Sequence, residues 1–520
     1  MAPHTAANGH TVGELSSLAA AGYAAETAFV DTWSDESCSW AEFDERSVRA
    51  ANAVRASAGQ GDRVAFLCAG SVDHVTLWNG ALKAGCVVSN LHTRGAPETA
   101  RYCIDELSPQ VVVVDESVAE FYREAVHDRV STAVGTVVVI GEADRRYEES
   151  ASSFVADRDD TPPDTHVAED DLAAVMWTSG TTGRPKGWCF THRGLLDRGM
   201  KLLSAGDHGH WTRRLQGLMP AFAAWYSGVL PAMLARSATY FVREWDPERY
   251  LELIEEHDLT RLTLVPTMWQ ELLRVEGFDT YDLGSLSVAG TAGERLTAET
   301  LRRLREDVCE RVVNSYAATE SVATFVRHDA ATDAPAGTVG RPTSLTDVRV
   351  VTPDGAPDET VPTGETGELI VRTTDQPVWA WNDTERTRAA FVDGWWYSGD
   401  LGYRDADGYL YLEGRTDFAI TSKGIQVHPG PVEERLTDHP AVDEAAVVGV
   451  EDDEYGERVT ALVYAPDADP APAELDQWCL DDDGLARHER PRAYAFVEDP
   501  LPRTVTGKLD RTAARDRLTE

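Results

Sequence analysis

Lysine is scarce in this sequence, although basic residues as a class are not. Among the 48 lysine and arginine residues, only five are lysine, namely Lys83, Lys186, Lys201, Lys423 and Lys508. Arginine-favouring codon usage would explain this scarcity without a functional cause. A compact ammonium, however, fits between two anionic oxygens where a planar guanidinium does not, so the remaining lysines are candidates for such positions.

Positive charge is also in short supply. The chain has 88 acidic residues against 48 basic ones, a net charge of −40 at pH 7 and an isoelectric point near 4.6. Such a surface repels phosphate backbones, which disfavours a nucleic-acid partner. The carboxylates also repel one another, and salt at about 1 M would screen that repulsion. We therefore expect a halophilic protein, although an ordinary acidic protein could have the same composition.

Cysteine pairs and metal-ligand clusters are absent from the sequence. The seven cysteines are odd in number and include no CxxC pair, which predicts reduced, mostly buried thiols in a cytoplasmic protein. His208 and His210 flank one glycine, but no third ligand is spaced to join them, so we expect them at the surface rather than on zinc.

The sequence has no segment typical of secretion or of a membrane span. Its first ten residues lack a basic start and an apolar core. One long uncharged run, 215–235, contains Pro220 and Pro231. Because proline interrupts helices, this run is expected to be a broken, buried segment that lines a pocket.

The order of the predicted elements indicates an α/β protein. Residues 44–58 and 74–85 have the apolar spacing of helices. Residues 110–115 and 135–141 are β-branched runs typical of buried parallel strands. A second αβ series extends from 172 to about 340.

Two further parts complete the predicted order. From 345 to 413, short strands with turn signals indicate a small β-rich subdomain. The boundary of a last unit is predicted at 414–423. For 520 residues, roughly three to four domains or subdomains are the expected number.

A loop rich in Gly, Ser and Thr follows the predicted strand at 173–176. It lies in TSGTTGRPKG, 178–187, and contains Lys186. Glycines let backbone N–H groups approach phosphate oxygens, hydroxyls donate further hydrogen bonds, and a lysine adds charge. A generic turn is the alternative, but a lysine in a lysine-poor chain favours an anion cradle. The segment is not a Walker A loop, because GxxxxGK[ST] cannot be aligned to it.

TSGTTGRPKG resembles the signature of the acyl-adenylate-forming (AMP-binding) superfamily, which includes acyl-CoA and aryl-CoA synthetases. Segments similar to its other motifs follow in the family's order, from about residue 25 to 515. The resemblance implies an α/β fold with a large N-terminal region of two αβ subdomains plus a β subdomain, hinged to a small α+β C-terminal domain. The domains would be 1–413 for ATP and the acyl group, 414–423 for the hinge and 424–520 for a mobile domain.

The resemblance assigns most of the nucleotide to the N-terminal region. AGTAGERL (289–296) is similar to the adenine-contacting loop, and NSYAATES (314–321) to the family's N-x-Y-G-x-T-E. Tyr316 would stack on adenine, Thr319 would bind the α-phosphate and Glu320 would hold Mg²⁺. The implied ATP-binding residues of this region are Thr178, Ser179, Gly180, Thr181, Thr182, Gly183, Lys186, Gly290, Gly293, Glu294, Tyr316 and Thr319.

The resemblance places the ribose contacts and the hinge further along the chain. WWYSGDLG (395–402) is similar to the ribose motif, in which Asp400 would accept hydrogen bonds from both ribose hydroxyls. In the segment 413–429, Arg415 would contact the ribose and Asp417 would be the hinge pivot.

PLPRTVTGKLDR (500–511) matches the family's C-terminal motif, whose lysine enters the active site during adenylation. Lys508 would bridge the substrate carboxylate and the α-phosphate. The family often has a second Asp where this chain has Phe418, and Arg or Lys where it has Gln426, which puts a phosphate contact from that loop in doubt. The implied catalytic residues are Lys508, Glu320, Thr319 and Lys186.

The acyl site is where this chain departs most from the family's pattern. PAFAAWYSG (220–228) stands where the family has P-L-F-H, with Ala223 in place of the histidine. Ala317 stands where acetate-restricted relatives have tryptophan. Both changes imply room for an acyl or aryl group larger than acetate, next to Ala223, Ala224, Trp225 and Ala317. Core packing is an equal alternative for the apolar residues of this segment.

The implied reaction joins a carboxylic acid to CoA through an acyl-adenylate and releases AMP and pyrophosphate. The implied requirements are ATP, Mg²⁺ and CoA, with fatty acid metabolism as one setting and a homodimer as one assembly. Free CoA is favoured because the acyl segment lacks the Asp of amino-acid-activating domains and no carrier domain is seen before residue 520. The alternative within the superfamily is an adenylating enzyme that loads a carrier protein. A non-catalytic nucleotide-binding protein is disfavoured by the intact motifs, and a P-loop phosphotransferase by the missing GK[ST].

Overall fold

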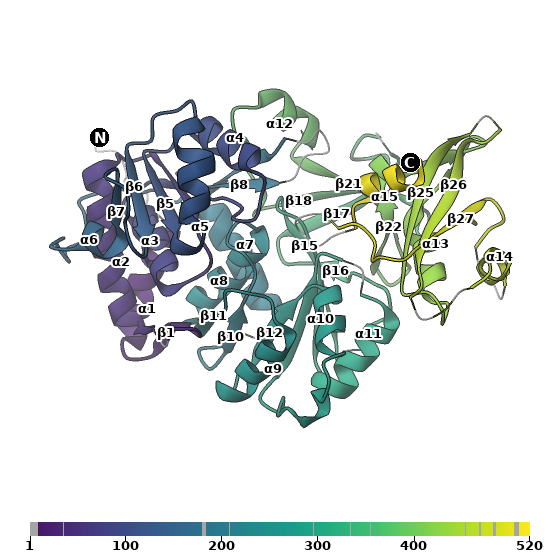
Figure 1. The fold of residues 1–520 in the computed structure, drawn as a ribbon, viewed down its shortest axis with the longest axis horizontal. Helices are drawn as coiled ribbons and strands as arrows, with labels where there is room; N and C mark the ends of the chain where they lie inside the picture. The colour runs from purple at the N-terminus through teal and green to yellow at the C-terminus, as the bar shows by residue number, and fades with distance from the viewer. Residues whose placement is uncertain are drawn as a thin grey trace. The chain divides into compact units, whose positions relative to one another are not determined.

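The fold is that of a computed structural model, shown as a ribbon in Figure 1. The structure describes residues 9–519 except 35, 179–183, 207, 295, 333, 354, 453, 467, 469, 482–484 and 504–508, and it describes 426 and 519 by their backbone alone. The chain forms two compact units, Met1–Asp347 with Arg372–Trp396, and Val348–Val371 with Tyr397–Glu520. The mixed helices and strands, with a larger N-terminal and a smaller C-terminal part, confirm the predicted fold class.

One sheet of the first unit carries several of the predicted nucleotide residues. Its strand order is β16-β15-β14-β13-β12-β10-β11-β1-β2, and the strands from β14 to β1 pair in parallel. Parallel strands end at the same edge of a sheet, so the segments that follow β13 and β14 are neighbours. The strands are β1 (Thr27–Asp31), β2 (Ser37–Ser39), β10 (Arg213–Gln216), β11 (Ala238–Phe241), β12 (Arg261–Leu264), β13 (Val288–Ala292), β14 (Val312–Ala317), β15 (Val322–His328) and β16 (Arg341–Pro342).

The second sheet of this unit holds the strands on either side of the predicted phosphate loop. Its order is β19-β9-β8-β4-β3-β5-β6-β7. The strands predicted at 110–115 and 135–141 are β5 and β6, which are buried and pair in parallel. The strands are β3 (Arg63–Leu67), β4 (Val87–Asn90), β5 (Val111–Asp115), β6 (Thr136–Ile140), β7 (Glu148–Ser150), β8 (Leu172–Thr178), β9 (Lys186–Thr191) and β19 (Trp379–Ala380).

Helices between the two sheets build the main hydrophobic core. Its buried side chains come from these helices and from one face of each sheet. The helices predicted at 44–58 and 74–85 correspond to α2 and α3. Ser39 and Glu42 form a capping box at the start of α2, which explains why that helix begins at Trp40. The helices are α2 (Trp40–Ser57), α3 (Val72–Lys83), α7 (His192–Ala205) and α8 (Ala223–Ala235).

Other helices cover the outer face of the first sheet. Leucine-rich side chains from them pack on β10, β12 and β13 in a second cluster, and Figure 1 shows these helices along that side. They are α9 (Pro247–Glu256), α10 (Pro266–Leu272) and α11 (Ala298–Arg303). The first sheet is therefore covered on both faces, as expected of a mainly parallel sheet.

The second unit combines β-strands of the middle of the chain with the C-terminal residues. β17 and β18 begin or end in the first unit, as does β21, and β22 pairs with β21. A further sheet has the order β24-β23-β26-β25, with β27 beside β26. Its elements are β17 (Thr346–Val351), β18 (Gly367–Thr373), β21 (Trp395–Arg404), β22 (Leu410–Arg415), β23 (Ile420–Ser422), β24 (Ile425–Val427), α13 (Pro429–Thr437), β25 (Glu444–Asp452), β26 (Gly456–Tyr464), α14 (Pro472–Leu480), β27 (Ala493–Val497) and α15 (Arg511–Thr519).

The division between the two units differs from the predicted domain boundary. The β-rich residues from 397 to 413 group with the C-terminal residues, whereas the sequence placed them in an N-terminal domain of 1–413. The predicted hinge, 414–423, lies inside the second unit. A pivot at Asp417 stays a prediction, because compactness in one conformation does not report a rotation.

The thiols follow the expected pattern, and the uncharged run does so in part, because Pro231 does not break its helix. All seven cysteines are free, and all but Cys309 are buried. The uncharged run 215–235 is divided between the end of β10, a connecting loop and α8, which has Pro231 inside it. In the part of the chain that the structure describes, no helix is both long enough and apolar enough to cross a membrane.

Candidate functional site

The predicted phosphate loop connects two paired strands. β8 and β9 are antiparallel, and their last paired residues are Thr178 and Lys186. The structure therefore brings both ends of the motif together. Ser179, Gly180, Thr181, Thr182 and Gly183 lie outside the described residues. The anion cradle at these positions stays a prediction.

The segment predicted to contact adenine follows the C-terminal end of β13. Gly290 is buried within that strand, and its carbonyl oxygen accepts a hydrogen bond from the Trp269 indole at 2.9 Å. Gly293 has a φ of +91°, a conformation that favours glycine, and a side chain there would meet no atom closer than 3.7 Å. Glu294 accepts hydrogen bonds from the backbone and hydroxyl of Thr267, in the first turn of α10. Gly293 thus has no close contact at the edge of the sheet, whereas Gly290 and Glu294 have structural contacts.

The loop between β14 and β15 carries the remaining predicted nucleotide residues of the first unit. Ala292 and Ser315 are register partners on β13 and β14, so the two motifs are adjacent. Tyr316 is 8% exposed, and the pairing of β14 with β15 shifts register just after it. Ala317, Thr319 and Glu320 are partly exposed. The predicted adenine, α-phosphate and Mg²⁺ residues are therefore brought together at one edge of the sheet.

Three buried charged side chains support this loop from the protein interior. Arg198, on α7, donates from Nη2 to the Thr319 carbonyl oxygen at 2.5 Å. Asp375 accepts the backbone N–H of Val322, on the far side of the loop, at 3.0 Å. Lys201 also lies on α7, with its Nζ 2.6 Å from Asp375. The backbone is therefore held within the loop and at the start of the strand that follows it.

The charges of this group are mutually compensated. Arg198 Nε lies 3.5 Å from Asp375, and neither side chain has any exposed surface. Burial lowers the pKa of Arg198, and the Asp375 and Glu320 carboxylates oppose that change. Burial raises the pKa of Asp375, but Arg198 and Lys201 outweigh burial and hold that pKa below its ordinary value. Asp375 therefore stays ionised and serves as the shared counter-ion of two cations.

The predicted acyl segment forms the start of α8. Ala223 is partly exposed and Ala224 is exposed. Trp225, in contrast, has no exposed surface. Its ring packs edge-on against the rings of Trp78 and Tyr226, with ring centroids 5.3 Å and 5.2 Å apart. The structure thus places Trp225 in the core between the sheets. Of the predicted acyl-site residues on this helix, the two alanines present a surface.

Asp400 and Arg415 lie side by side in the second unit. They are register partners on β21 and β22, and Arg415 Nη1 lies 3.1 Å from an Asp400 carboxylate oxygen. Arg415 Nη2 lies 3.3 Å from Asp417, which follows β22. Gly399 has a φ of +71°, and a side chain there would meet Arg415 at 2.9 Å. The sequence therefore identified three residues that form one ion-paired group.

The lysines that the predicted site does not use have acidic partners. Lys83 Nζ lies 2.9 Å from Asp44, and Lys423 Nζ lies 2.6 Å from Glu454. Lys201 pairs with Asp375, as described above. Lys508 is outside the described residues, as is the Gln426 side chain. Lysine scarcity was the one sequence signal that pointed to Lys201.

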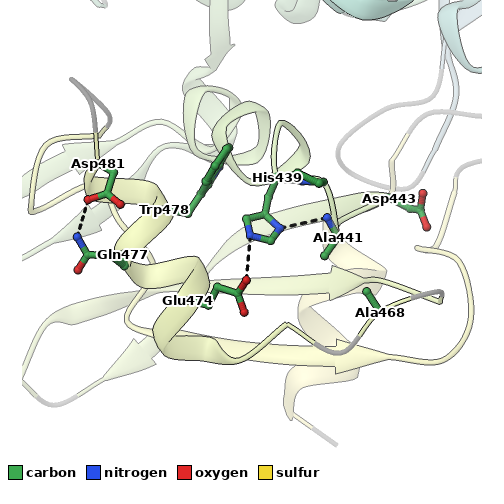
Figure 2. Close-up of a pocket in the computed structure, with 9 residues that line it drawn as sticks. His439, Ala441, Asp443, Ala468, Glu474, Gln477, Trp478 and Asp481 are labelled. Atoms are coloured by element: carbon green, nitrogen blue, oxygen red, sulfur yellow. Dashed lines mark hydrogen bonds and ion pairs between the residues drawn. The ribbon is translucent and has the colours of Figure 1, made fainter.

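A surface hollow of about 710 Å³ lies elsewhere on the second unit (Figure 2). The His439 imidazole points into it between Glu474, 3.6 Å away, and the Trp478 ring. Asp443 and Asp481 add further carboxylates to its wall. Carboxylates repel ATP and CoA, so this hollow is not suited to the predicted substrates.

Comparison with known families covers both units of the chain. The family described as "AMP-binding enzyme" matches residues 17–376. The family described as "AMP-binding enzyme C-terminal domain" matches residues 431–508, so its match ends at the position of Lys508.

Individual relatives match over most or all of the chain. The chain is 30% identical over 496 residues to 3-hydroxybenzoate–CoA ligase of Aromatoleum sp. (strain CIB), which covers 93% of this chain and 92% of that protein. It is 35% identical over 368 residues to 4-chlorobenzoate–CoA ligase of Arthrobacter sp., which covers 69% and 68%. The crystal structure of ATP-bound MatB from Rhodopseudomonas palustris has a TM-score of 0.86 and 26% identity over 98% of this chain and 99% of that chain.

Proposed function

The chain belongs to the AMP-binding enzyme family, and on that premise we propose that it is an ATP-dependent ligase that joins an aromatic carboxylic acid to CoA. The products would be the aryl-CoA thioester, AMP and pyrophosphate. The predicted class, an acid–thiol ligase that forms an adenylate, is confirmed by the relatives named as CoA ligases. That the acid is aromatic is the more specific part of the proposal.

One observation carries this proposal beyond family membership. The loop with Thr319 and Glu320 is fixed in place by Arg198 and Asp375, and it lies next to the β13 end that carries Gly293. An enzyme that joins two anions, a carboxylate and a phosphate, depends on charges held in position before the reaction. The ion pair beneath this loop fixes the loop's backbone in this way.

The reaction would proceed in two displacements. A carboxylate oxygen attacks the α-phosphorus of ATP, the bond to the β-phosphate oxygen breaks, and pyrophosphate leaves. The CoA thiolate then attacks the acyl carbon of the adenylate, and the bond to AMP breaks. Lys508 would offset negative charge in the first displacement, because it would lie between the carboxylate and the α-phosphate.

The other proposed roles are those that the resemblance to the family implies. Lys186 and the hydroxyls of the 178–183 loop would bind phosphate oxygens, and Thr319 would bind the α-phosphate. Tyr316 would stack on adenine. Asp400 would bind both ribose hydroxyls, with Arg415 beside it. Asp417 would be the pivot when the C-terminal domain rotates between the two displacements.

Mg²⁺ suits the donor set of the first unit. Glu320 offers a partly exposed carboxylate, and no group of three or more His, Cys, Asp or Glu residues is positioned to bind a metal among the residues that the structure describes. Mg²⁺ commonly binds through one carboxylate, water and substrate phosphates rather than through a cage of protein ligands. When bound, it would neutralise phosphate charge, and Glu320 would hold it.

The proposed substrate class comes from two relatives and from the alanines. Both relatives are named for substituted benzoates, and both match over at least two thirds of this chain. Ala223, Ala224 and Ala317 leave more room than bulkier side chains would, and the nearby Phe222 ring offers an apolar contact. A fatty acid is the alternative acid, and its metabolism was the setting expected from the sequence.

The thiol acceptor and the cellular setting are also proposed. CoA is the acceptor named for both relatives, and loading of a carrier protein is the alternative. Free, mostly buried thiols favour a reducing cytoplasm, and the net charge of −40 favours a salt-rich one. The homodimer considered from the sequence stays a prediction.

Trapping of the acyl-adenylate tests the proposed acid and does not depend on which thiol is the acceptor. The protein is incubated with ATP, Mg²⁺, hydroxylamine and either 3-hydroxybenzoate, 4-chlorobenzoate, hexanoate or acetate. Hydroxamate formed from a benzoate, and little from acetate, is the expected result. Hydroxamate from hexanoate alone would reject the aromatic acid but keep the ligase, and hydroxamate from none of the acids would contradict both.

A further inference from the structure

Two buried arginines lie on neighbouring strands of the first sheet. Arg214, on β10, is 4% exposed and Arg261, on β12, is 6% exposed. The two residues are register partners in the parallel pairing of these strands, so their side chains project from the same face of the sheet. Thr239, on β11, is the register partner of Arg214 on its other side and has no exposed surface. The three side chains therefore form one polar row across β11, β10 and β12.

Among the described residues, which leave out Asp207, no counter-charge accompanies this pair. In the described part of the chain, no carboxylate oxygen lies within 4.0 Å of either guanidinium. Arg214 Nη2 lies 3.2 Å from a nitrogen of the His208 ring, and Arg261 donates to the Gly206 carbonyl oxygen at 2.5 Å. Both of these partners are uncharged acceptors, because burial lowers the pKa of His208.

Several hydrogen-bond donors of the row are left unused. Nε of Arg214, Nε of Arg261 and the hydroxyl of Thr239 are buried and have no hydrogen-bond partner. A buried charge without a partner is strongly unfavourable. Burial and the charge of Arg261 lower the pKa of Arg214. The Cys309 thiol near Arg261 offers no compensating charge at neutral pH, because burial raises its pKa.

We propose that Arg214 and Arg261 bind a small inorganic anion of the size of chloride, with Thr239 as a further donor. The two unused guanidinium N–H groups can only donate, and the Thr239 hydroxyl can donate as well. Beside two positive charges, these donors select an anion rather than a cation or a neutral molecule. The anion would complete the hydrogen bonds of the row and neutralise part of its charge. His208, predicted at the surface together with His210, is partly exposed, and its ring also lies beside Arg214 at this site.

The surrounding backbone limits the size of the anion. α8 passes close to Arg214, because a side-chain carbon placed on Gly228 would lie 3.4 Å from Arg214 Nη1. At the end of α7, a side-chain carbon on Gly206 would lie 2.9 Å from His208. A monatomic anion needs the least space between these segments. A nucleotide phosphate with its ribose and base needs far more.

The row also lies at the opposite edge of the sheet from the proposed nucleotide residues. Arg261 is the first residue of β12 and Arg214 is the second of β10, whereas Gly293 and Thr319 follow the C-terminal ends of β13 and β14. In a parallel sheet, strand starts and strand ends lie at opposite edges. The anion would therefore act on stability and not on the reaction. Its role is separate from screening of the acidic surface, which any salt provides.

Thermal unfolding in two potassium salts separates specific anion binding from general screening of the acidic surface. The full chain is unfolded by heat in KCl and in potassium gluconate, both at about 1 M so that K⁺ and ionic strength are equal. The expected result is a higher Tm in chloride, with a rise of about 2 °C for each tenfold increase in chloride above its Kd at fixed K⁺. Equal Tm values in the two salts would overturn the proposal.

Variants show whether the dependence of Tm on chloride arises at the two arginines. Arg214→Met/Arg261→Met should remove the dependence on chloride and keep the dependence on K⁺. Arg213→Gln, an exposed neighbour paired with Asp258, is the matched control and should leave both dependences unchanged. If the double variant does not fold, Thr239→Val is used instead, and a smaller chloride dependence is expected.

Crystals grown in KBr give a direct readout that does not depend on a variant. An anomalous bromide peak within hydrogen-bond distance of both guanidiniums would support the site. No peak at these arginines, or a sulfate that stabilises at lower concentration than chloride, would overturn the assignment to a halide.

Discussion

The two units hold the charges of the proposed site in different ways. In the first, Arg198 and Asp375 are fully buried and fix the loop between β14 and β15 through its backbone. In the second, Arg415 pairs with Asp400 and Asp417, whose side chains are 18% and 49% exposed. The first arrangement sets positions before a substrate binds. In the second arrangement the ion pairs are exposed and therefore weak. A bound nucleotide can take the place of one member of such a pair.

Removal of Lys508 should have the largest effect on the reaction. Lys508→Ala is expected to lower adenylation by about a thousandfold or more, since an ammonium between two anionic oxygens has no substitute. Conversion of supplied aryl-adenylate and CoA to the thioester should fall by less than about tenfold. Pyrophosphate release and thioester formation are measured separately. Lys423→Ala, which removes a lysine paired at the surface with Glu454, is the control and should change neither rate appreciably. Equal losses in both steps would reject the assigned role of Lys508.

Loss of the shared counter-ion should be the most destabilising change. Asp375→Asn leaves Arg198 and Lys201 buried without a carboxylate, which we expect to lower the free energy of unfolding by about 3–5 kcal/mol. Adenylation should fall as well, because the loop is then free to shift. Urea unfolding measures the first effect. Asp347→Asn, which breaks an exposed pair with Arg372, should stay within about 0.5 kcal/mol of the wild type. A small effect of Asp375→Asn would show that the two regions do not differ as described.

The same carboxylate should give the first unit a defined pH dependence. The pKa of Asp375 lies below the unfolded value of about 3.9, because Arg198 and Lys201 outweigh burial. Its stabilising contribution is therefore fully present above pH 4 and is lost as the pH falls through the folded pKa. The free energy of unfolding is compared for wild type and Asp375→Asn between pH 3 and 7. The difference should shrink at the acidic end, and a constant difference would contradict the lowered pKa.

In the second unit, substitution of Asp400 should act on ATP binding. Asp400→Ala removes the proposed ribose acceptor and is expected to raise the KM for ATP roughly tenfold to a hundredfold. The KM for the aromatic acid should change little. Asp358→Ala, at an exposed position of the same unit, is the control. An unchanged KM for ATP would reject the ribose assignment.

Salt should have the smallest and broadest effect. Activity is expected to rise a few-fold as KCl is raised toward about 1 M, because screening reduces repulsion among surface carboxylates. Initial rates at fixed Mg²⁺ from 0.05 to 3 M KCl measure it. Maximal activity at low salt would remove the proposal of a halophilic protein.

Contiguous motifs made much of the fold and part of the site predictable from the sequence. The β-branched runs at 110–115 and 135–141 became β5 and β6, because local pattern alone specifies a buried parallel strand. Thr319 and Glu320 were identified for the same reason, since their motif is read within a few neighbouring residues. Paired strands then brought Thr178 to Lys186 and Asp400 to Arg415.

Contacts between distant residues were not predictable in this way. Lys201 and Asp375 are separated by 174 positions, and neither lies in a motif. The burial of Trp225 and the place of His208 beside Arg214 depend equally on how sheets and helices pack, which one sequence does not encode locally. The grouping of residues 397–413 with the C-terminal residues likewise depends on which neighbours a strand has, and a strand pattern does not show this.

The most direct test of the proposed function is AMP release from ATP and Mg²⁺ at high KCl, with 3-hydroxybenzoate or 4-chlorobenzoate, in the presence and absence of CoA. The account predicts AMP and aryl-CoA in equal amounts, formed only when an aromatic acid and CoA are both present. Sustained AMP release without CoA would favour a carrier protein as the acceptor. ADP as the product, or no dependence on any acid, would contradict the account.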